Sequence, residues 1–150
     1  MFRGVAHISL DARGRIAYPS RNRGRLSSIC DGRLVMTVGR DHCLLVYPLP
    51  EWEDIEQKLV RLPSLNRGAR QLQRLLIGHA TECQLDGSGR ILLPPPLREF
   101  AGLEKHTVLI GQGNKFELWD ESAWTQRRDE WLVEAADSDE LPGDLESLSL

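Results

Sequence analysis

Two short segments of the chain carry the same arrangement of a carboxylate, a glycine and an arginine. Residues 10–16 read LDARGRI and residues 85–91 read LDGSGRI, so five of the seven positions agree. An aspartate at the start of a turn can accept hydrogen bonds from backbone amides two residues on, and the glycine supplies a positive φ. The pattern D-x-x-G-R therefore predicts a tight hairpin turn that presents one arginine where it ends.

The arginine is the part of this pattern that a turn does not need. A surface ion pair between Arg15 and Asp11, or between Arg90 and Asp86, would contribute only about 0–1 kcal/mol to stability. A guanidinium also offers a planar fork of donors that suits phosphate oxygens and guanine edges. Two interpretations remain open: a good turn that is used twice, or a nucleic-acid surface that is presented twice.

The charge distribution favours a nucleic-acid surface in the first half of the chain. The net charge is −3, but residues 1–50 carry a balance of +5, residues 51–100 are balanced, and residues 101–150 carry −8. Six arginines lie within the first 25 residues against one acidic residue, Asp11: Arg3, Arg13, Arg15, Arg21, Arg23 and Arg25. A solvated face explains many such clusters, yet a basic region inside an acidic protein is typical of nucleic-acid binding.

The repeat extends beyond the turns and indicates a duplicated unit. Pro19 matches Pro94 and Arg23 matches Arg98 at the same offset of 75, and the offset becomes 72 from Gly39 onward. Alternation predicts strands over 5–9, 15–19, 33–38 and 43–48, and again over 80–85, 90–94, 107–111 and 115–119. Helical spacing of apolar residues predicts helices over 51–62, 65–77 and 122–135.

These elements predict a first unit over 1–50, a helical connector over 51–78, a second unit over 79–120 and a C-terminal helix over 121–136. The acidic segment 137–150 is expected to be a flexible tail. Segment 20–28 contains Asn22 and Gly24 and is poor in helix formers, so a flexible basic loop is expected there. With no apolar run near the roughly 20 residues of a membrane span and no signal peptide, a cytoplasmic protein is expected.

An enzyme and a scaffold are the alternatives to DNA binding. Cys30, Cys43 and Cys83 are too few for a disulfide framework and are expected to be free thiols. His79 and Cys83 have the spacing of half a metal site, although a core cysteine beside a surface histidine explains them better. Common catalytic motifs are lacking, so no catalysis, cofactor or small-molecule substrate is expected. In a scaffold that does not bind DNA, the tryptophans would anchor protein interfaces: Trp52, Trp119, Trp124 and Trp131.

Several segments together resemble one known family. MFRG, LDARGRI, LDGSGRILLPPPLREFAGL and VLIGQGNKFELWDESAW are similar to the MraZ family of bacterial transcriptional regulators, over about residues 1–135. That family belongs to the AbrB/SpoVT-like superfamily of swapped-hairpin barrels. The resemblance implies a mainly β, α+β fold in which two AbrB-like units form one barrel, with a helix or helix pair after each unit.

The resemblance also implies a function. Family members form ring-shaped homo-oligomers and bind tandem direct repeats in the promoter of a division and cell-wall gene cluster, commonly as repressors at the nucleoid. The partner implied is double-stranded DNA. The residues implied to contact DNA are the Asp and Arg of each turn, with two further arginines as nearby phosphate contacts: Asp11, Arg15, Asp86 and Arg90, then Arg3 and Arg13.

Overall fold

The computed structural model describes residues 1–137, and the segment expected to be an acidic tail lies outside them apart from Asp137. The first unit contains β1 (Val5–Ser9), β2 (Arg15–Ala17), α1 (Ser20–Cys30), β3 (Arg33–Val38), β4 (Leu44–Pro48) and α2 (Leu49–Val60). A connecting helix α3 (Arg67–Leu72) continues into a π-helical turn η1 (Gln73–Ile77). The second unit contains β5 (Thr81–Gln84), β6 (Arg90–Leu92), α4 (Pro95–Phe100), β7 (His106–Gly111), β8 (Phe116–Asp120) and α5 (Glu121–Asp137).

The two units exchange strands with each other. A six-stranded antiparallel sheet has the order β1-β7-β8-β4-β3-β5, and a separate two-stranded ribbon joins β2 to β6. The first strand of each unit thus pairs with the third strand of the other unit, as β1 with β7 and β5 with β3. The expected α+β fold with an internally duplicated, strand-swapped unit is confirmed, and both units supply strands to the same sheet and the same ribbon.

The main core lies between the ribbon and one face of the large sheet. Ile16 and Ile91 sit opposite each other in the ribbon, and each is 1% exposed. They pack against alternate residues of the sheet strands, among them Leu34, Met36, Leu44, Val46, Leu109 and Leu118. Since strand side chains alternate between faces, the intervening Val35 points to the other side and packs with Trp52 of α2.

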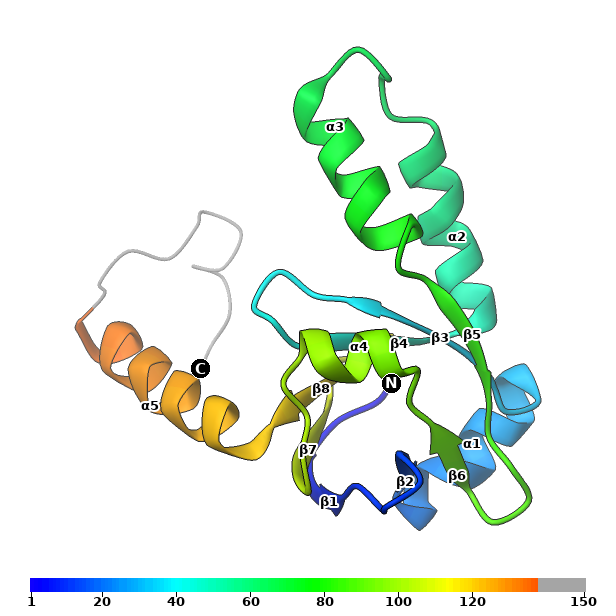
Figure 1. The fold of residues 1–150 in the computed structure, drawn as a ribbon, viewed down its shortest axis with the longest axis vertical. Coiled ribbons are helices and arrows are strands. Elements are labelled where there is room, and N and C mark those ends of the chain that lie inside the picture. The colour runs from blue at the N-terminus through cyan, green and yellow to red at the C-terminus, as the bar shows by residue number, and fades with distance from the viewer. Residues whose placement is uncertain (138–150) are drawn as a thin grey trace.

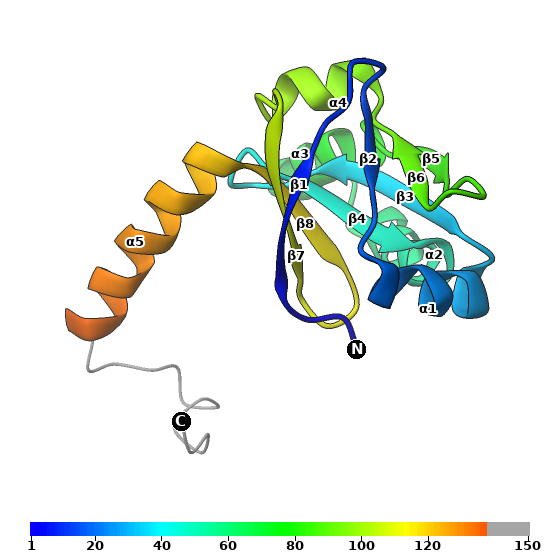
Figure 2. The ribbon, with the colours of Figure 1, turned by 90° about the horizontal axis from the view of Figure 1, so that it is seen from below.

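Two helical elements extend from this body. Helix α2 and the helix formed by α3 and η1 project together from the sheet, and α5 leaves on another side (Figures 1 and 2). Trp119 of β8 holds the start of α5 through edge-on contacts with Trp124 and Trp131. No helix among residues 1–137 is long and apolar enough to cross a membrane.

The prediction of a flexible loop over residues 20–28 was wrong. These residues form most of α1, which follows Pro19 and buries Asn22, Leu26 and Cys30 at intervals of four. The helix ends where Asp31 and Gly32 take positive φ values and their amides bond back to the carbonyls of Ser27 and Leu26. Burial of one helical face and this C-terminal cap outweigh the low helix propensity of Asn22 and Gly24.

Candidate nucleic-acid interface

The two D-x-x-G-R segments form the same turn, built by the aspartate. One carboxylate oxygen of Asp11 accepts hydrogen bonds from the amides of Arg13 and Arg15, both at 2.9 Å. Asp86 likewise accepts from Ser88 at 2.8 Å and Arg90 at 2.9 Å. Each turn is closed by a backbone bond from its aspartate to its arginine. The predicted turn is therefore confirmed at both positions, whereas the prediction that it joins the two strands of a hairpin was wrong.

The strands beside each turn do not form a ladder with each other, as a simple hairpin would. Instead, the turns are tied across the two units by matching backbone bonds. The amide of Leu93 donates to the carbonyl of Gly14 at 2.8 Å, and the amide of Tyr18 donates to that of Gly89 at 2.9 Å. The two donors, Tyr18 and Leu93, are 75 residues apart, and so are the two acceptors, Gly14 and Gly89. The two turns are therefore equivalent under an approximate twofold symmetry.

The ribbon places the two turn arginines on one face. Arg15 pairs in register with Leu92, and Ala17 pairs with Arg90, on either side of the buried Ile16–Ile91 pair. Because side chains alternate along a strand, Arg15 and Arg90 both point away from the core. They are diagonal neighbours across the ribbon, a relation that brings long side chains within reach of each other.

The charges of the two turns are linked across the ribbon. Arg15 Nε lies 3.5 Å from Asp11 Oδ2. The hydrogen-bonded amide of Arg15 holds the pKa of Asp11 below its ordinary value, and the amide of Arg13 and the charge of Arg15 add to this. The Arg90 amide chiefly lowers the pKa of Asp86, with help from the Ser88 amide and from the charges of Arg15 and Arg90. Arg15 therefore acts electrostatically on both turns.

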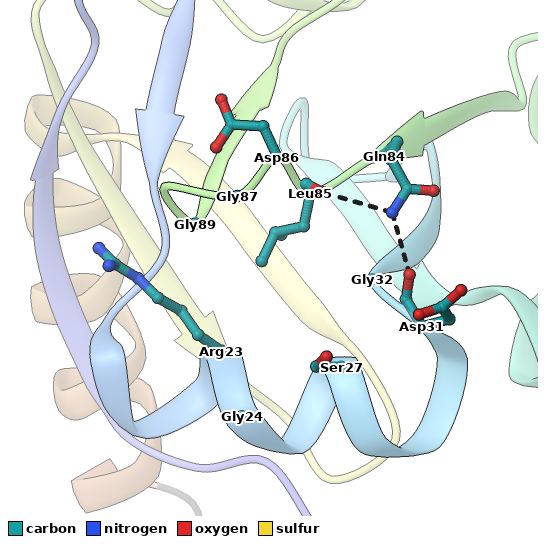
Figure 3. Close-up of a pocket in the computed structure, with 10 residues that line it drawn as sticks. All are labelled: Arg23, Gly24, Ser27, Asp31, Gly32, Gln84, Leu85, Asp86, Gly87 and Gly89. Atoms are coloured by element: carbon teal, nitrogen blue, oxygen red, sulfur yellow. Dashed lines mark hydrogen bonds between the residues drawn. The ribbon is translucent and has the colours of Figure 1, made fainter.

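Arg23 and Arg98, which match in the repeat, cover the turn glycines in a reciprocal manner. Gly14 and Gly89 are buried with φ values of +80° and +74°. A side chain at Gly14 would collide with the guanidinium of Arg98 in α4, and one at Gly89 would collide with Arg23 in α1. Arg23 Nε also donates to the carbonyl of Tyr18 at 2.6 Å. Each helix thus braces the turn of the other unit, and Figure 3 shows one of the two pairs, Arg23 of α1 on the side of the turn that contains Gly89.

The structure brings most of the predicted site residues together but not all of them. Asp11, Arg13 and Arg15 share the first turn, and Asp86 and Arg90 share the second. Arg3 stands apart, because the five residues of β1 separate it from the first turn by about 17 Å of strand. Arg3 lies instead beside Arg21 and Arg25, in a hollow between the N-terminus and α1.

Sequence reasoning assigned no role to Arg23 and Arg98, although their match in the repeat was visible. The match alone does not indicate a role for the two arginines, because a helical arginine at a matched position is often an ordinary solvated residue. The strand exchange is what carries each arginine to the turn of the opposite unit. Knowledge of the strand pairing is therefore needed before this signal can be interpreted.

The features considered for catalysis or scaffolding have local structural explanations. Cys30, Cys43 and Cys83 are free thiols, as expected. His79 is exposed and its Nδ1 bonds to the carbonyl of Leu75, while Cys83 is partly buried. Among residues 1–137, no group of three or more His, Cys, Asp or Glu side chains is placed to hold a metal ion. Trp52 and Trp119 are 3% and 2% exposed and belong to the packed interior.

Comparisons with known proteins agree with this architecture. A family model described as "MraZ protein, putative antitoxin-like" matches the chain twice, over residues 1–75 and 76–140. The transcriptional regulator MraZ of Halorhodospira halophila is 66% identical over 152 residues, which cover 100% of both chains. The protein of the same name from Thioalkalivibrio sulfidiphilus is 65% identical over 150 residues, and that from Pseudomonas aeruginosa 54% over 151, again with 100% of both chains covered. The chain therefore belongs to the MraZ family of transcriptional regulators, which are not enzymes.

Proposed function

We propose that the protein is a sequence-specific DNA-binding regulator that represses transcription by binding with the β2–β6 ribbon and its two turns. The observation that carries this proposal is the register of the ribbon. Arg15 and Arg90 come from different halves of the chain, yet both project from the outer face of the same two strands. A two-stranded ribbon fits the major groove, and arginine forks match the acceptor pair of guanine.

The aspartates have a defined part in this interface. Asp11 and Asp86 use one oxygen each to fix the turn backbone from which the arginine emerges. The second oxygen of Asp11 faces the guanidinium of Arg15. An arginine that is already oriented loses less side-chain entropy when it binds DNA. This favours specific recognition of a base over non-specific electrostatic binding. Arg13 is exposed at the tip of the first turn and is suited to a phosphate contact.

We further propose that the DNA consists of tandem direct repeats in the promoter of the division and cell-wall gene cluster that contains the protein's own gene. The protein would meet these repeats at the nucleoid as a ring-shaped homo-oligomer. Weak contacts from several subunits gain avidity when the repeats are spaced to match them. Helix α5 offers exposed apolar side chains for subunit contacts, since Leu132 and Val133 are 63% and 62% exposed.

The test is a binding titration on the upstream region of the gene at low and high salt. Wild type is compared with Arg15→Ala and with Arg90→Ala, and Arg67→Ala in α3 serves as a control. Both turn variants should lose specific binding, and the control should bind like wild type. The size of each assembly, measured by sedimentation, shows whether the loss arises at the DNA surface.

A scaffold that does not bind DNA is the competing function, and the exposed apolar residues of α5 are the observation in its favour. The same titration separates the two. A wild-type assembly of normal size that shows no preference for the upstream region over random DNA would contradict the repressor and leave the scaffold. Loss of specific binding in Arg15→Ala but not in Arg90→Ala would restrict DNA reading to the first turn.

A further inference from the structure

A second basic site lies between the N-terminus and α1, apart from the two turns. It is a hollow of about 380 Å³ lined by Met1, Arg3, Gly4, Arg21, Asn22 and Arg25. Arg21 and Arg25 are one helical turn apart on α1, and so they extend from the same side of that helix. Arg23 lies between them in sequence and reaches the Gly89 turn instead.

The cations of this hollow are held together without a carboxylate. Arg25 donates to the carbonyl of Met1, and its guanidinium lies 5.2 Å above the ring of Phe2. The Arg21 guanidinium occupies the space beside Gly4, where a side chain would collide with it. Among residues 1–137, no Asp or Glu side chain lies within salt-bridge distance of Arg3, Arg21 or Arg25. Because three like charges that line one hollow repel one another, the cluster favours the binding of an anion.

The amide of Asn22 lies in the same hollow. Asn22 is only 8% exposed, which is an unusual position for a polar side chain, yet it lines the hollow. Its side-chain nitrogen and oxygen are not among the fully buried polar atoms of residues 1–137 that lack a partner, so they can be reached from the hollow. The amide can therefore donate to an acceptor that enters the hollow beside the arginines.

The hollow is not a by-product of the duplication. At the repeat offset of 75, the positions of Arg3, Arg21 and Arg25 correspond to Gly78, Pro96 and Phe100 in the second unit. Asn22 corresponds to Leu97, an apolar residue that is 2% exposed. The second unit thus has uncharged residues at the positions that match the three arginines, so the duplicated fold does not by itself require arginine there.

We propose that this hollow binds one phosphate group, through the guanidinium groups of Arg21, Arg25 and Arg3 and the amide of Asn22. As the source of that phosphate we take the backbone of the DNA held by the turns, a choice that rests on the proposed function. Arg15 and Arg21 are six residues apart, which limits their separation to roughly 20 Å. That is shorter than one turn of duplex DNA, about 34 Å, so one duplex can reach both.

The test measures how the affinity for DNA depends on salt. A guanidinium pair that neutralises one phosphate should release about one counterion, and log K against log salt should become shallower by about 1 when the pair is removed. We compare wild type with Arg21→Gln/Arg25→Gln, on the upstream region and on random DNA of equal length. Arg67→Gln/Arg74→Gln removes the same charge from the connector and is the matched control.

The expected result is weaker binding to both DNAs with the shallower slope, in the double variant and to a lesser degree in Arg21→Gln alone. The single variant guards against misfolding, because Arg21 makes no side-chain hydrogen bond to residues 1–137. Unchanged affinity, or the same loss in the connector control, would overturn the DNA backbone as the source. Loss confined to the upstream region with an unchanged slope would overturn it too.

Inorganic phosphate provides a second arm that does not need DNA binding. Wild type and the double variant are heated in phosphate and in chloride at equal ionic strength. A rise in Tm by phosphate that the double variant lacks supports a phosphate site, even if wild type binds no DNA and the repressor fails. Combined with the shallower salt slope, it supports the DNA backbone as the source, and combined with unchanged DNA binding it would assign the site to free phosphate instead. Absence of any effect in both arms would overturn the site itself.

Discussion

The guanidinium of Arg98 occupies the space in which any side chain at Gly14 would have to stand. Arg23 stands in the same relation to Gly89, and the two arginines are 75 positions apart, as are the two glycines. Each turn is therefore supported by a helix of the other unit. The strand exchange explains this support, because β2 and β6 lie side by side and carry each turn to the opposite helix.

Replacement of the turn glycine should be costly, and the neighbouring glycine provides a control. Gly89→Ala would place a Cβ at a φ of +74° and against Arg23, so we expect a loss of about 1–2 kcal/mol in the free energy of unfolding. Gly87→Ala in the same turn has open space and no positive φ, and it should change stability by less than about 0.5 kcal/mol. Urea unfolding measures both. Equal losses of stability in the two variants would show that the positive φ of Gly89 and its contact with Arg23 do not restrict this position to glycine.

The reciprocal support predicts a crossed effect on turn dynamics. Arg23→Lys keeps the charge but removes the Nε donor that holds the carbonyl of Tyr18, so amides in the turn 86–89 should exchange faster. Arg98→Lys should instead loosen the turn 11–14. Hydrogen exchange followed by NMR distinguishes the two turns, and specific DNA affinity should fall with each variant. Faster exchange in both turns for either variant would indicate general destabilisation rather than positioning.

Much of this arrangement was predictable from sequence because it rests on local chemistry. The aspartate, glycine and arginine of LDARGRI specify a turn with little help from elsewhere, and alternation identifies strands such as Arg33–Val38. The matched pairs across the repeat also indicate two copies of one unit. What the pattern does not contain is pairing partners, since a strand with one apolar face fits any suitable neighbour.

The remaining features depend on tertiary contacts. Residues 20–28 have poor helix propensity, and only burial against the sheet makes them helical. The grouping of Arg3 with Arg21 and Arg25 arises because β1 leads away from the N-terminus and β2 runs back, which places α1 beside residues 1–4 (Figure 2). No local pattern encodes this path. The same holds for Arg98, whose position over Gly14 follows from the strand exchange.

Helix α1 makes a direct prediction about residues 20–28. Leu26 is fully buried, whereas Ile29 on the same helix is 50% exposed. Leu26→Ala should lower the free energy of unfolding by about 2–5 kcal/mol, through lost burial and the cavity that remains. Ile29→Ala should have an effect within about 0.5 kcal/mol. Similar effects at the two positions, measured by chemical denaturation, would argue for the loop rather than the helix.

Acid should destabilise the protein partly through the two turns. The pKa values of Asp11 and Asp86 are lowered in the folded state, so the unfolded chain binds more protons in acid. Their contribution to stability is complete above the ordinary value of 3.8 and is lost as pH falls through the lower folded values. In Asp11→Asn/Asp86→Asn, the urea midpoint should therefore fall less between pH 5 and pH 3 than in wild type. Asp54→Asn, on the exposed side of α2, is the control and should keep the wild-type dependence.

The tryptophan cluster should determine how firmly α5 is attached. Trp131 makes edge-on contacts with Trp119 and Trp124, at centroid distances of 5.7 Å and 5.8 Å, and Arg127 covers its ring. Each aromatic pair contributes roughly 0.5–1.5 kcal/mol beyond burial, so Trp131→Ala should speed amide exchange along α5 while leaving the ribbon protected. Glu134→Ala alters an exposed residue of the same helix and should leave exchange in α5 unchanged. If the two variants exchanged alike, α5 would be held by contacts other than this cluster.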